Sequence, residues 1–428
     1  MGFGIFILPL LSKIIFPVVI LFFLYLTLSN NNKNDEALMG AAYIMGFEVL
    51  SRMTNAAFSY EFAKYMVIVF LTIGMFYRGF HRKSWPYVVF IFLLIPGIIF
   101  SAINLNYGTN VGNAIGFNLS GPVCLAISGL YCYDRKMTLE RLQSILICIL
   151  LPLVTMTSYL YFFTPDLRES LSGTGSNFSA SGGFGPNQVA TILGIGMFIL
   201  FSRLLTIKNK AVNLIDLALL GLMSYRALVT FSRGGVITAA VCAFFFLVLY
   251  FLRLPPKEKS HLVPKMAIIT GMLIVTWLVT LFFSSGLIGN RYSNEDAAGR
   301  LKSDITTGRS EIIETELKAF YENPITGIGV GKGKEYREKQ TGVSAATHNE
   351  TGRMLAEHGI FGLSGLLVLL LTPLLLRLKN KTNFYFYSFL AFWFLTINHS
   401  SMRIAAPALV YGLSLISIIN NREIKKKH

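Results

Sequence analysis

The chain is dominated by apolar segments, each close to the length of a membrane-spanning helix and separated from the next by polar residues. A helix needs about 20 mostly apolar residues to cross a bilayer. The pattern predicts an all-α, polytopic membrane protein with 12 or 13 transmembrane helices, and it leaves the side of the N-terminus open. The candidate segments lie at residues 5–28, 38–51, 60–79, 86–102, 116–131, 141–163, 188–206, 212–230, 236–253, 266–288, 359–376, 384–399 and 403–420.

Two early segments are irregular. Residues 1–28 are too long for a cleavable signal and lack a small-residue cleavage site, so they are interpreted as the first membrane segment. The second segment is short and contains Glu48, which lies four residues before Arg52. On a helix this spacing permits an ion pair.

Composition agrees with a membrane protein, because 53% of the 428 residues are hydrophobic and only 14% are charged. A soluble protein would carry about 25% charged residues. The four cysteines have neither metal-ligand nor disulfide spacing and are given no role.

The net charge of +16 does not indicate nucleic-acid binding, because the basic residues are gathered in short loops between apolar segments. Such loops favour the cytoplasmic side of a membrane. The remaining loops, at residues 103–115, 164–187, 231–235 and 289–347, are therefore expected outside. The basic clusters are His81 to Lys83, Arg135 to Lys136 with Arg141, Lys208 with Lys210, Lys257 to Lys265, Arg377 to Lys381 and Arg422 to Lys427.

Two outer loops hold most of the candidate chemistry. Loop 164–187 is rich in glycine and serine and ends in a Gly185-Pro186-Asn187 turn. In loop 289–347, a helix is predicted from Arg309 to Glu322, entered through Thr306-Thr307-Gly308 and stopped by Asn323-Pro324. The glycine-rich turn at 326–333 matches neither a nucleotide loop nor a dinucleotide fingerprint.

The chain is accordingly divided into four parts. N-terminal transmembrane helices occupy 1–180, and central transmembrane helices occupy 181–288. A long outer loop, which is the candidate catalytic region, follows at 289–358. C-terminal helices and a basic cytoplasmic tail complete the chain at 359–428.

The sequence Thr347-His348-Asn349-Glu350 has the form of a helix start at the end of the long outer loop. Thr347 is expected to cap the helix and Glu350 to close a capping box, which places His348 in the first turn. The positive end of the helix dipole disfavours a protonated imidazole. His348 is therefore a candidate general base, and the alternative is a histidine that only packs at a helix start.

Arginines on the same side suggest a bound anion. Arg233 follows an apolar segment at the outer surface, beside Gly234 and Gly235, which would let a bulky group approach. Arg309 opens the loop helix, where it either pairs with a nearby glutamate or binds phosphate. Arg226 lies inside a segment and is expected to have a buried partner or a polar cavity. Two guanidiniums and a neutral histidine suit transfer from a pyrophosphate-activated donor to an alcohol.

These motifs resemble the signature of the O-antigen ligase and O-antigen polymerase (Wzy-like) family of bacterial inner-membrane glycosyltransferases. The resemblance covers residues 182 to 365 and rests on Phe231-Ser232-Arg233-Gly234-Gly235, Gly308-Arg309-Ser310-Glu311, His348-Asn349 and Glu357-His358-Gly359-Ile360-Phe361-Gly362. It implies a GT-C-like protein with a donor glycan on undecaprenyl pyrophosphate. It also implies catalysis in the periplasm without a metal or another cofactor.

The resemblance implies roles for individual residues. His348 matches the histidine proposed to deprotonate the acceptor, and Arg233 and Arg309 match the arginines proposed to hold the pyrophosphate. Thr351-Gly352 replaces a bulky apolar residue often found after His-Asn-Glu, which could change the acceptor pocket. Further supporting or substrate residues are expected at Asn349, Glu350, Ser232, Asn187 and Lys332, with Tyr321 and Lys334 also along the sugar path.

The acceptor stays open at this stage. It could be lipid A-core (a ligase), a growing glycan chain (a Wzy-like polymerase) or a protein hydroxyl (a protein O-oligosaccharyltransferase). A lipid-linked glycan transporter is the alternative from another class, and Glu48, Arg52 and Arg226 are the features that favour it.

Overall fold

The computed structural model describes residues 1–164, 171, 173–302, 309–342 and 347–419, and these ranges are almost entirely helical. The helices are α1 (Gly2–Ile7), α2 (Leu10–Ser29), α3 (Glu36–Met53), α4 (Phe62–Arg78), α5 (Trp85–Asn104), α6 (Val111–Cys132), α7 (Leu139–Phe163), α9 (Pro186–Thr206), α10 (Lys210–Val229), α11 (Arg233–Arg253), α12 (Pro256–Lys259), α13 (Leu262–Phe283), α14 (Leu287–Tyr292), α15 (Arg309–Glu322), α16 (Lys332–Thr341), α17 (Glu350–Lys379), α18 (Phe386–Ile397) and α19 (Ala406–Ser414). Two short strands, β1 (Lys136–Thr138) and β2 (Ser417–Ile419), pair in parallel.

Each of the thirteen predicted apolar segments contains a helix. Within the described ranges, nine helices are long and apolar enough to cross a membrane. The other segments correspond to α3, α4, α18 and α19, which are shorter or carry charged residues. The protein is thus an all-α polytopic membrane protein.

The first and last predicted segments differ from the structure in detail. The first is broken between α1 and α2 at Leu8-Pro9, because proline lacks an N–H and disfavours a helical residue before it. The last ends as a helix at Ser414 and continues into β2. Ser417 at the start of β2 donates a hydrogen bond to Asp134, which also accepts from Asn380.

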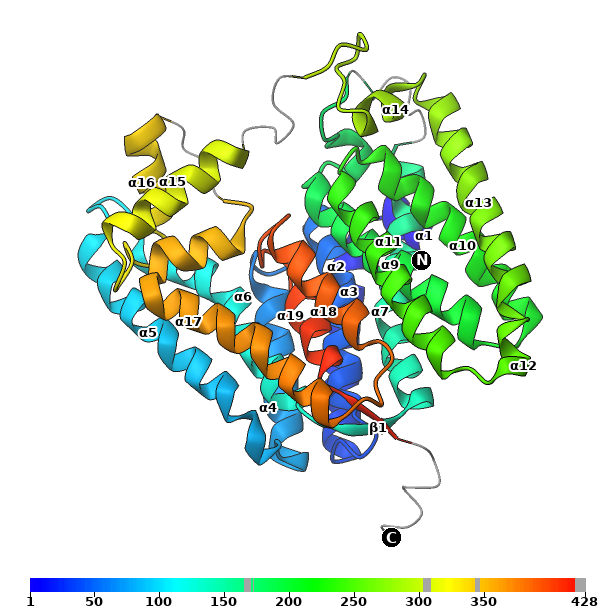
Figure 1. Ribbon diagram of the computed structural model, residues 1–428, viewed down its shortest axis with the longest axis horizontal. Helices are drawn as coiled ribbons and strands as arrows, with labels where there is room; N and C mark the ends of the chain where they lie inside the picture. Colours follow the sequence, from blue (N-terminus) through cyan, green and yellow to red (C-terminus); the bar gives the residue numbers. More distant parts are fainter. Residues whose placement is uncertain (165–170, 172, 303–308, 343–346, 420–428) are drawn as a thin grey trace.

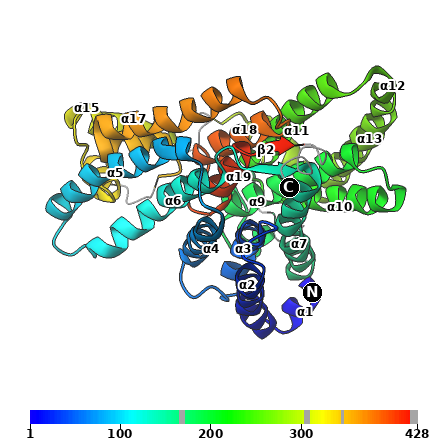
Figure 2. The same ribbon diagram turned by 90° about the horizontal axis from the view of Figure 1, so that it is seen from below.

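Helices α3, α9 and α19 form the interior, and nearly all of their side chains are buried. Three groups of helices surround them (Figures 1 and 2). Helices α1, α2, α4 and α7 pack around α3, and α10, α11 and α13 lie on the side of α9. Helices α5, α6, α15 and α17 form the third group. The N-terminal helix α1 packs against the C-terminal half of α7, where Phe6 stacks on Phe162.

The basic loops gather at one end of the molecule and the predicted outer loops at the other (Figure 1). At the basic end, Arg135 donates to the carbonyl of Gly79 at 3.1 Å, and Arg253 donates to Lys381. At the opposite end, Arg291 of loop 289–347 reaches the carbonyl of Phe231 at 3.0 Å. The alternation of short basic loops and polar outer loops is therefore as predicted. The cluster from Arg422 to Lys427 lies outside the described residues.

Helix α15 runs from Arg309 to Glu322 as predicted, whereas its expected entry at 306–308 lies outside the described residues. The glycine-rich turn after α15 makes backbone hydrogen bonds to α5 and α17. Val330 donates its N–H to Gly97 of α5 at 3.1 Å, and Ile328 donates to Ala356 of α17 at 2.9 Å. Gly359 bends α17 with φ +58°, and Ile360 then donates to Pro324 at 2.8 Å. The turn therefore fixes α15 and α16 to the membrane helices.

Glu48 and Arg52, two of the charged residues that favoured a transporter, make an ion pair and hydrogen bonds within the fold. Glu48 pairs with Arg52 at 2.5 Å and accepts from the N–H of Ala405 at 2.7 Å. Arg52 also donates to the carbonyl of Arg403 at 3.1 Å. These contacts join α3 to the loop at 398–405 between α18 and α19, which we call the α18–α19 loop.

Two further charges have equally fixed contacts. Lys64 of α4 donates to the carbonyl of Met402 in the α18–α19 loop at 3.2 Å. Arg226 donates to carbonyls of Leu160 and Thr164 at the end of α7, and its guanidinium lies 4.3 Å from the centre of the Tyr161 ring. The expected buried partner of Arg226 is therefore the end of a neighbouring helix.

Candidate functional site

His348 lies just before α17 and not in its first turn. Asn349 is the N-cap, and its side chain accepts from the N–H groups of Thr351 and Gly352 at 3.0 and 3.3 Å. The hydroxyl of Thr347 accepts from Asn349 N–H at 2.9 Å. The predicted capping box is thus wrong, because Asn349 supplies the cap.

The surroundings of His348 nevertheless keep its imidazole neutral. Burial, together with the positive charges of Arg403, Arg309 and Arg337, lowers the pKa of His348 to about 4. The cause is desolvation and nearby guanidiniums, rather than the helix dipole that the sequence suggested. Its Nδ1 atom is buried and has no hydrogen-bond partner within the described ranges. Buried polar atoms normally have a partner, so this nitrogen, unbonded among the described residues, is not explained by packing alone.

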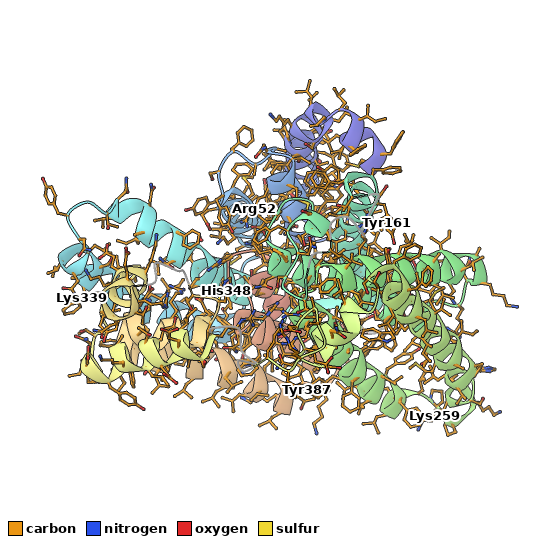
Figure 3. The ribbon with its side chains drawn as sticks, turned by 90° about the horizontal axis from the view of Figure 1, so that it is seen from above. Arg52, Tyr161, Lys259, Lys339, His348 and Tyr387 are labelled. Atoms are coloured by element: carbon orange, nitrogen blue, oxygen red, sulfur yellow. The ribbon has the colours of Figure 1, made fainter. Side chains whose placement is uncertain are left out.

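The α18–α19 loop holds the backbone of this segment. Ser401 donates its N–H to the carbonyl of His348 at 3.1 Å. Arg403 donates to the carbonyl of Thr347 at 2.6 Å. No role for this loop could be predicted from the sequence, because only residues 400–402 separate the apolar segments 384–399 and 403–420. Figure 3 shows His348 between the end of the molecule marked by Lys339 and its densely packed centre.

Arg233, Arg291 and Arg309 form a cluster, which we call the arginine cluster. Burial lowers the pKa of Arg309, and repulsion from Arg233 adds to this effect. Burial likewise lowers the pKa of Arg291, with both other guanidiniums adding. Arg233 is half-buried and donates to the carbonyl of Arg291 at 3.4 Å. Arg291 was not among the residues predicted from the sequence to bind an anion.

The arginine cluster has no carboxylate partner within 4 Å among the described residues. The alternative that Arg309 pairs with Glu311 or Glu314 is therefore not what the structure shows. Buried charges are normally paired, since an unpaired charge costs free energy. Three adjacent guanidiniums whose contacts among the described residues are with carbonyls and a histidine are suited to an anion with several oxygens.

His399 links the arginine cluster to Ser232 and Asn187. A guanidinium can only donate, so the contact of 3.4 Å between Arg309 and His399 Nδ1 makes that nitrogen an acceptor. His399 Nε2 then carries the proton and donates to Ser232 Oγ at 3.2 Å. Ser232 donates to Asn187 Oδ1 at 2.8 Å. Burial lowers the pKa of His399 to about 3, which agrees with this neutral tautomer.

The two glycines after Arg233 have different tasks. A Cβ on Gly234 would lie 2.4 Å from atoms of the His399 ring, so the bulky group that Gly234 admits is this imidazole. A Cβ on Gly235 would lie 2.0 Å from the carbonyl oxygen of Ala190 in α9. Gly235 therefore permits close packing of α11 on α9, whereas Gly234 leaves room for His399.

Of the predicted supporting residues, Asn187, Ser232 and Asn349 lie in these networks. Glu350 lies nearby but pairs with Arg353, at the start of α17. Lys332 does not join the arginine cluster. It contacts Asn106 at 2.9 Å and Glu335 at 2.7 Å, and so ties α16 to the loop between α5 and α6.

A cavity of about 620 Å³ lies beside the His348 segment. Thr347, Ser401 and Arg403 line it where it meets this segment, and none of the three clustered arginines is among its lining residues. The cavity and the arginine cluster are thus separate, and the His348 segment lies near both. In the ranges that the structure describes, the side chains of His, Cys, Asp and Glu form no group of three suited to a metal ion.

The structure is thus that of a polytopic membrane protein with a cluster of arginines beside a neutral histidine. Residues 218–367 match the family model described as O-antigen ligase, so this segment is an O-antigen ligase domain. Members of that family are O-antigen ligases and polymerases, enzymes that transfer glycans, which implies lipid-linked glycan substrates. The match contains Arg233, Arg291, Arg309 and His348. Neither the curated proteins nor the solved structures gave a match.

Proposed function

We propose that this protein is a glycosyltransferase that moves a glycan from undecaprenyl pyrophosphate to the hydroxyl of an acceptor. The single observation that carries the proposal is the arginine cluster, which has no carboxylate partner among the described residues and lies beside neutral His348. The family of the matched segment supports the same donor class.

His348 accepts the proton of the acceptor hydroxyl as that oxygen attacks the anomeric carbon. A bond forms between the acceptor oxygen and this carbon, and the bond from the carbon to the pyrophosphate oxygen breaks. The anomeric configuration is inverted. Arg233 and Arg309, with Arg291 beside them, stabilise the negative charge that develops on the leaving pyrophosphate. Undecaprenyl pyrophosphate leaves as the second product.

The proposed location is the bacterial inner membrane, with the site on the periplasmic face. The basic loops among the described residues lie at one end of the molecule, with α15 and α16 toward the other (Figure 1), and positively charged loops favour the cytoplasm. The N-terminal helix α1, which packs against the outer half of α7, would then lie toward the periplasm.

The test is an assay of the purified protein with an undecaprenyl-pyrophosphate-linked glycan and candidate acceptors. We expect a glycosylated acceptor and released undecaprenyl pyrophosphate in equal amounts. Movement of intact lipid-linked glycan across vesicles without cleavage would instead support transport. Ligase, polymerase and protein-glycosylating activities share the donor step and are separated by which acceptor becomes labelled.

The pH dependence of transfer should reflect the unusual state of His348. A base must be neutral, and the pKa of about 4 keeps His348 neutral through most of the acidic range. We expect kcat/KM for the donor to fall only below about pH 5, whereas an ordinary histidine would lose activity near pH 6.5. In kcat the fall should occur at higher pH, because bound pyrophosphate stabilises the imidazolium. A fall of kcat/KM centred near pH 6.5 would contradict this assignment.

Alanine substitutions at Gly234 and Gly235 should separate activity from folding. Gly234→Ala displaces only a side chain, His399, so we expect a folded protein with transfer reduced about tenfold or more. Gly235→Ala forces α11 away from the backbone of α9, so we expect a clearly lower melting temperature. Gly271→Ala is the control, since a Cβ there meets nothing within 4 Å. Thermal unfolding in detergent measures the loss of stability, and the transfer assay measures the loss of activity. Full activity of Gly234→Ala would show that transfer does not depend on the position of the His399 ring beside the arginine cluster.

A further inference from the structure

The cavity beside His348 has a lining unlike that of the arginine cluster. It is formed by the start of α6, by α15 and α16, by the start of α17 and by the α18–α19 loop. Its volume of about 620 Å³ lies within the range of about 300–1,000 Å³ that is usual for small-ligand sites. The polar groups that line it include the amides of Asn106, Asn110, Asn113 and Asn118.

Two of the four cations that line this cavity are paired with carboxylates. Arg353 pairs with Glu350 and also with Glu357, the latter at 2.7 Å. Arg337 pairs with Glu316 at 3.2 Å. These ion pairs are buried, so little of their positive charge is available to a ligand.

The other two cations of the lining are Arg403 and Lys334. Arg403 donates to the carbonyl of Thr347. Lys334 is exposed on α16, and the carboxylates of Glu335 and Glu338 also line the cavity. The lining holds the carboxylates of Glu316, Glu335, Glu338, Glu350 and Glu357 and the cations of Lys334, Arg337, Arg353 and Arg403, and Glu335 is also paired with Lys332 beside the cavity. Among the described residues, a phosphorylated ligand would therefore meet no group of adjacent guanidiniums like the arginine cluster.

Amide and carboxylate groups are suited to sugar hydroxyls, which both donate and accept hydrogen bonds. Phe117 adds an exposed aromatic side chain to the same lining, on which a sugar ring can pack. The cavity also reaches Thr347 and Ser401, the neighbours of His348 in sequence and in hydrogen bonding. A hydroxyl bound at this end of the cavity would lie next to the base.

We propose that this cavity binds the acceptor, and that the acceptor presents an uncharged, hydroxyl-rich sugar end rather than a phosphorylated one. The donor pyrophosphate occupies the arginine cluster on the other side of His348. This inference rests on the proposed function and adds the acceptor's chemistry and its place. Lys334 is then a specificity-determining residue at the wall of the cavity.

Two lysines of α16 provide a matched test. Lys334 lines the cavity and Lys339 does not, and both are exposed. Lys334→Trp should raise KM for a neutral oligosaccharide acceptor about tenfold or more and leave KM for the donor unchanged. Lys339→Trp removes the same charge from the same helix and should change neither. Lys334→Trp behaving like Lys339→Trp, or raising KM for the donor alone, would overturn the proposal.

Binding can also be measured without turnover. Lys334→Cys and Lys339→Cys are labelled with a maleimide, and the native cysteines are buried or half-buried. A neutral trisaccharide should slow labelling at position 334 and leave position 339 unaffected. The same trisaccharide carrying a phosphate should protect less well. Equal or better protection by the phosphorylated sugar would refute the uncharged acceptor.

Failure of this inference can be distinguished from failure of the proposed function. If the wild-type protein releases no undecaprenyl pyrophosphate with any acceptor, the proposed function itself is wrong. If release is normal but Lys334→Trp and the labelling experiment show no acceptor effect, only the assignment of the cavity is wrong.

Discussion

Replacement of His348 by alanine is expected to lower kcat for glycan transfer by about 10²- to 10⁴-fold, the usual contribution of a general base. The structure gives the reason, since the imidazole is neutral, half-buried and near both the arginine cluster and the cavity that Thr347 lines. Binding of the donor should change little, because the arginine cluster remains. A single-turnover transfer assay, together with a separate measurement of donor affinity, distinguishes a loss of kcat from a loss of donor binding.

His261→Ala is the matched control for this experiment. His261 is exposed at the basic end of the molecule, beside α13, and its replacement should leave transfer unchanged. Wild-type kcat in His348→Ala, in a protein with normal expression and melting temperature, would exclude His348 as the base. Another group would then have to accept the proton.

Replacement of Arg309 by alanine is expected to reduce transfer by about 10²- to 10³-fold, as for loss of one preorganised donor to a developing negative charge. Arg309 also supplies the hydrogen bond to His399 Nδ1. The melting temperature should stay the same or rise, because the change relieves repulsion from Arg233 and Arg291. Loss of activity without loss of stability is typical of a residue retained for ligand binding.

Arg300→Ala supplies the comparison. Arg300 lies in the same loop, but its side chain is 80% exposed and pairs with Asp296. Its loss should leave both transfer and stability nearly unchanged. Arg309→Lys should recover only part of the activity, because lysine lacks the planar fork of a guanidinium. A large loss of stability in Arg309→Ala would show that Arg309 supports the fold and would weaken its role as a ligand for pyrophosphate.

Much of the helical arrangement could be predicted, because long apolar segments and a helix stop such as Asn323-Pro324 act locally. The bounds of α15 were predicted correctly for this reason. The capping box was not, since Thr347 and Asn349 are both good caps and tertiary contacts select between them. Local patterns therefore give the elements, whereas the choice between similar local options depends on packing.

The candidate site could be predicted only in part. Arg233, Arg309 and His348 belong to short motifs, but Arg291 and His399 are single residues in an unremarkable context. Their roles depend on α14 and the α18–α19 loop lying against α11, a proximity that no spacing in the sequence encodes. The same holds for the cavity, whose walls come from five parts of the chain.

The contact of α3 and α4 with the α18–α19 loop bears on how far the matched segment can be treated as a module. Arg52 and Lys64 lie well before residue 218, and both donate hydrogen bonds to backbone carbonyls of this loop. Such contacts leave the loop's side chains free to diverge while keeping its shape. Exchange of the 218–367 segment alone between relatives would separate His348 from the elements that fix its position. Chimaeras that keep α3, α4 and the α18–α19 loop from one parent should therefore succeed more often than exchanges made at the limits of the matched segment.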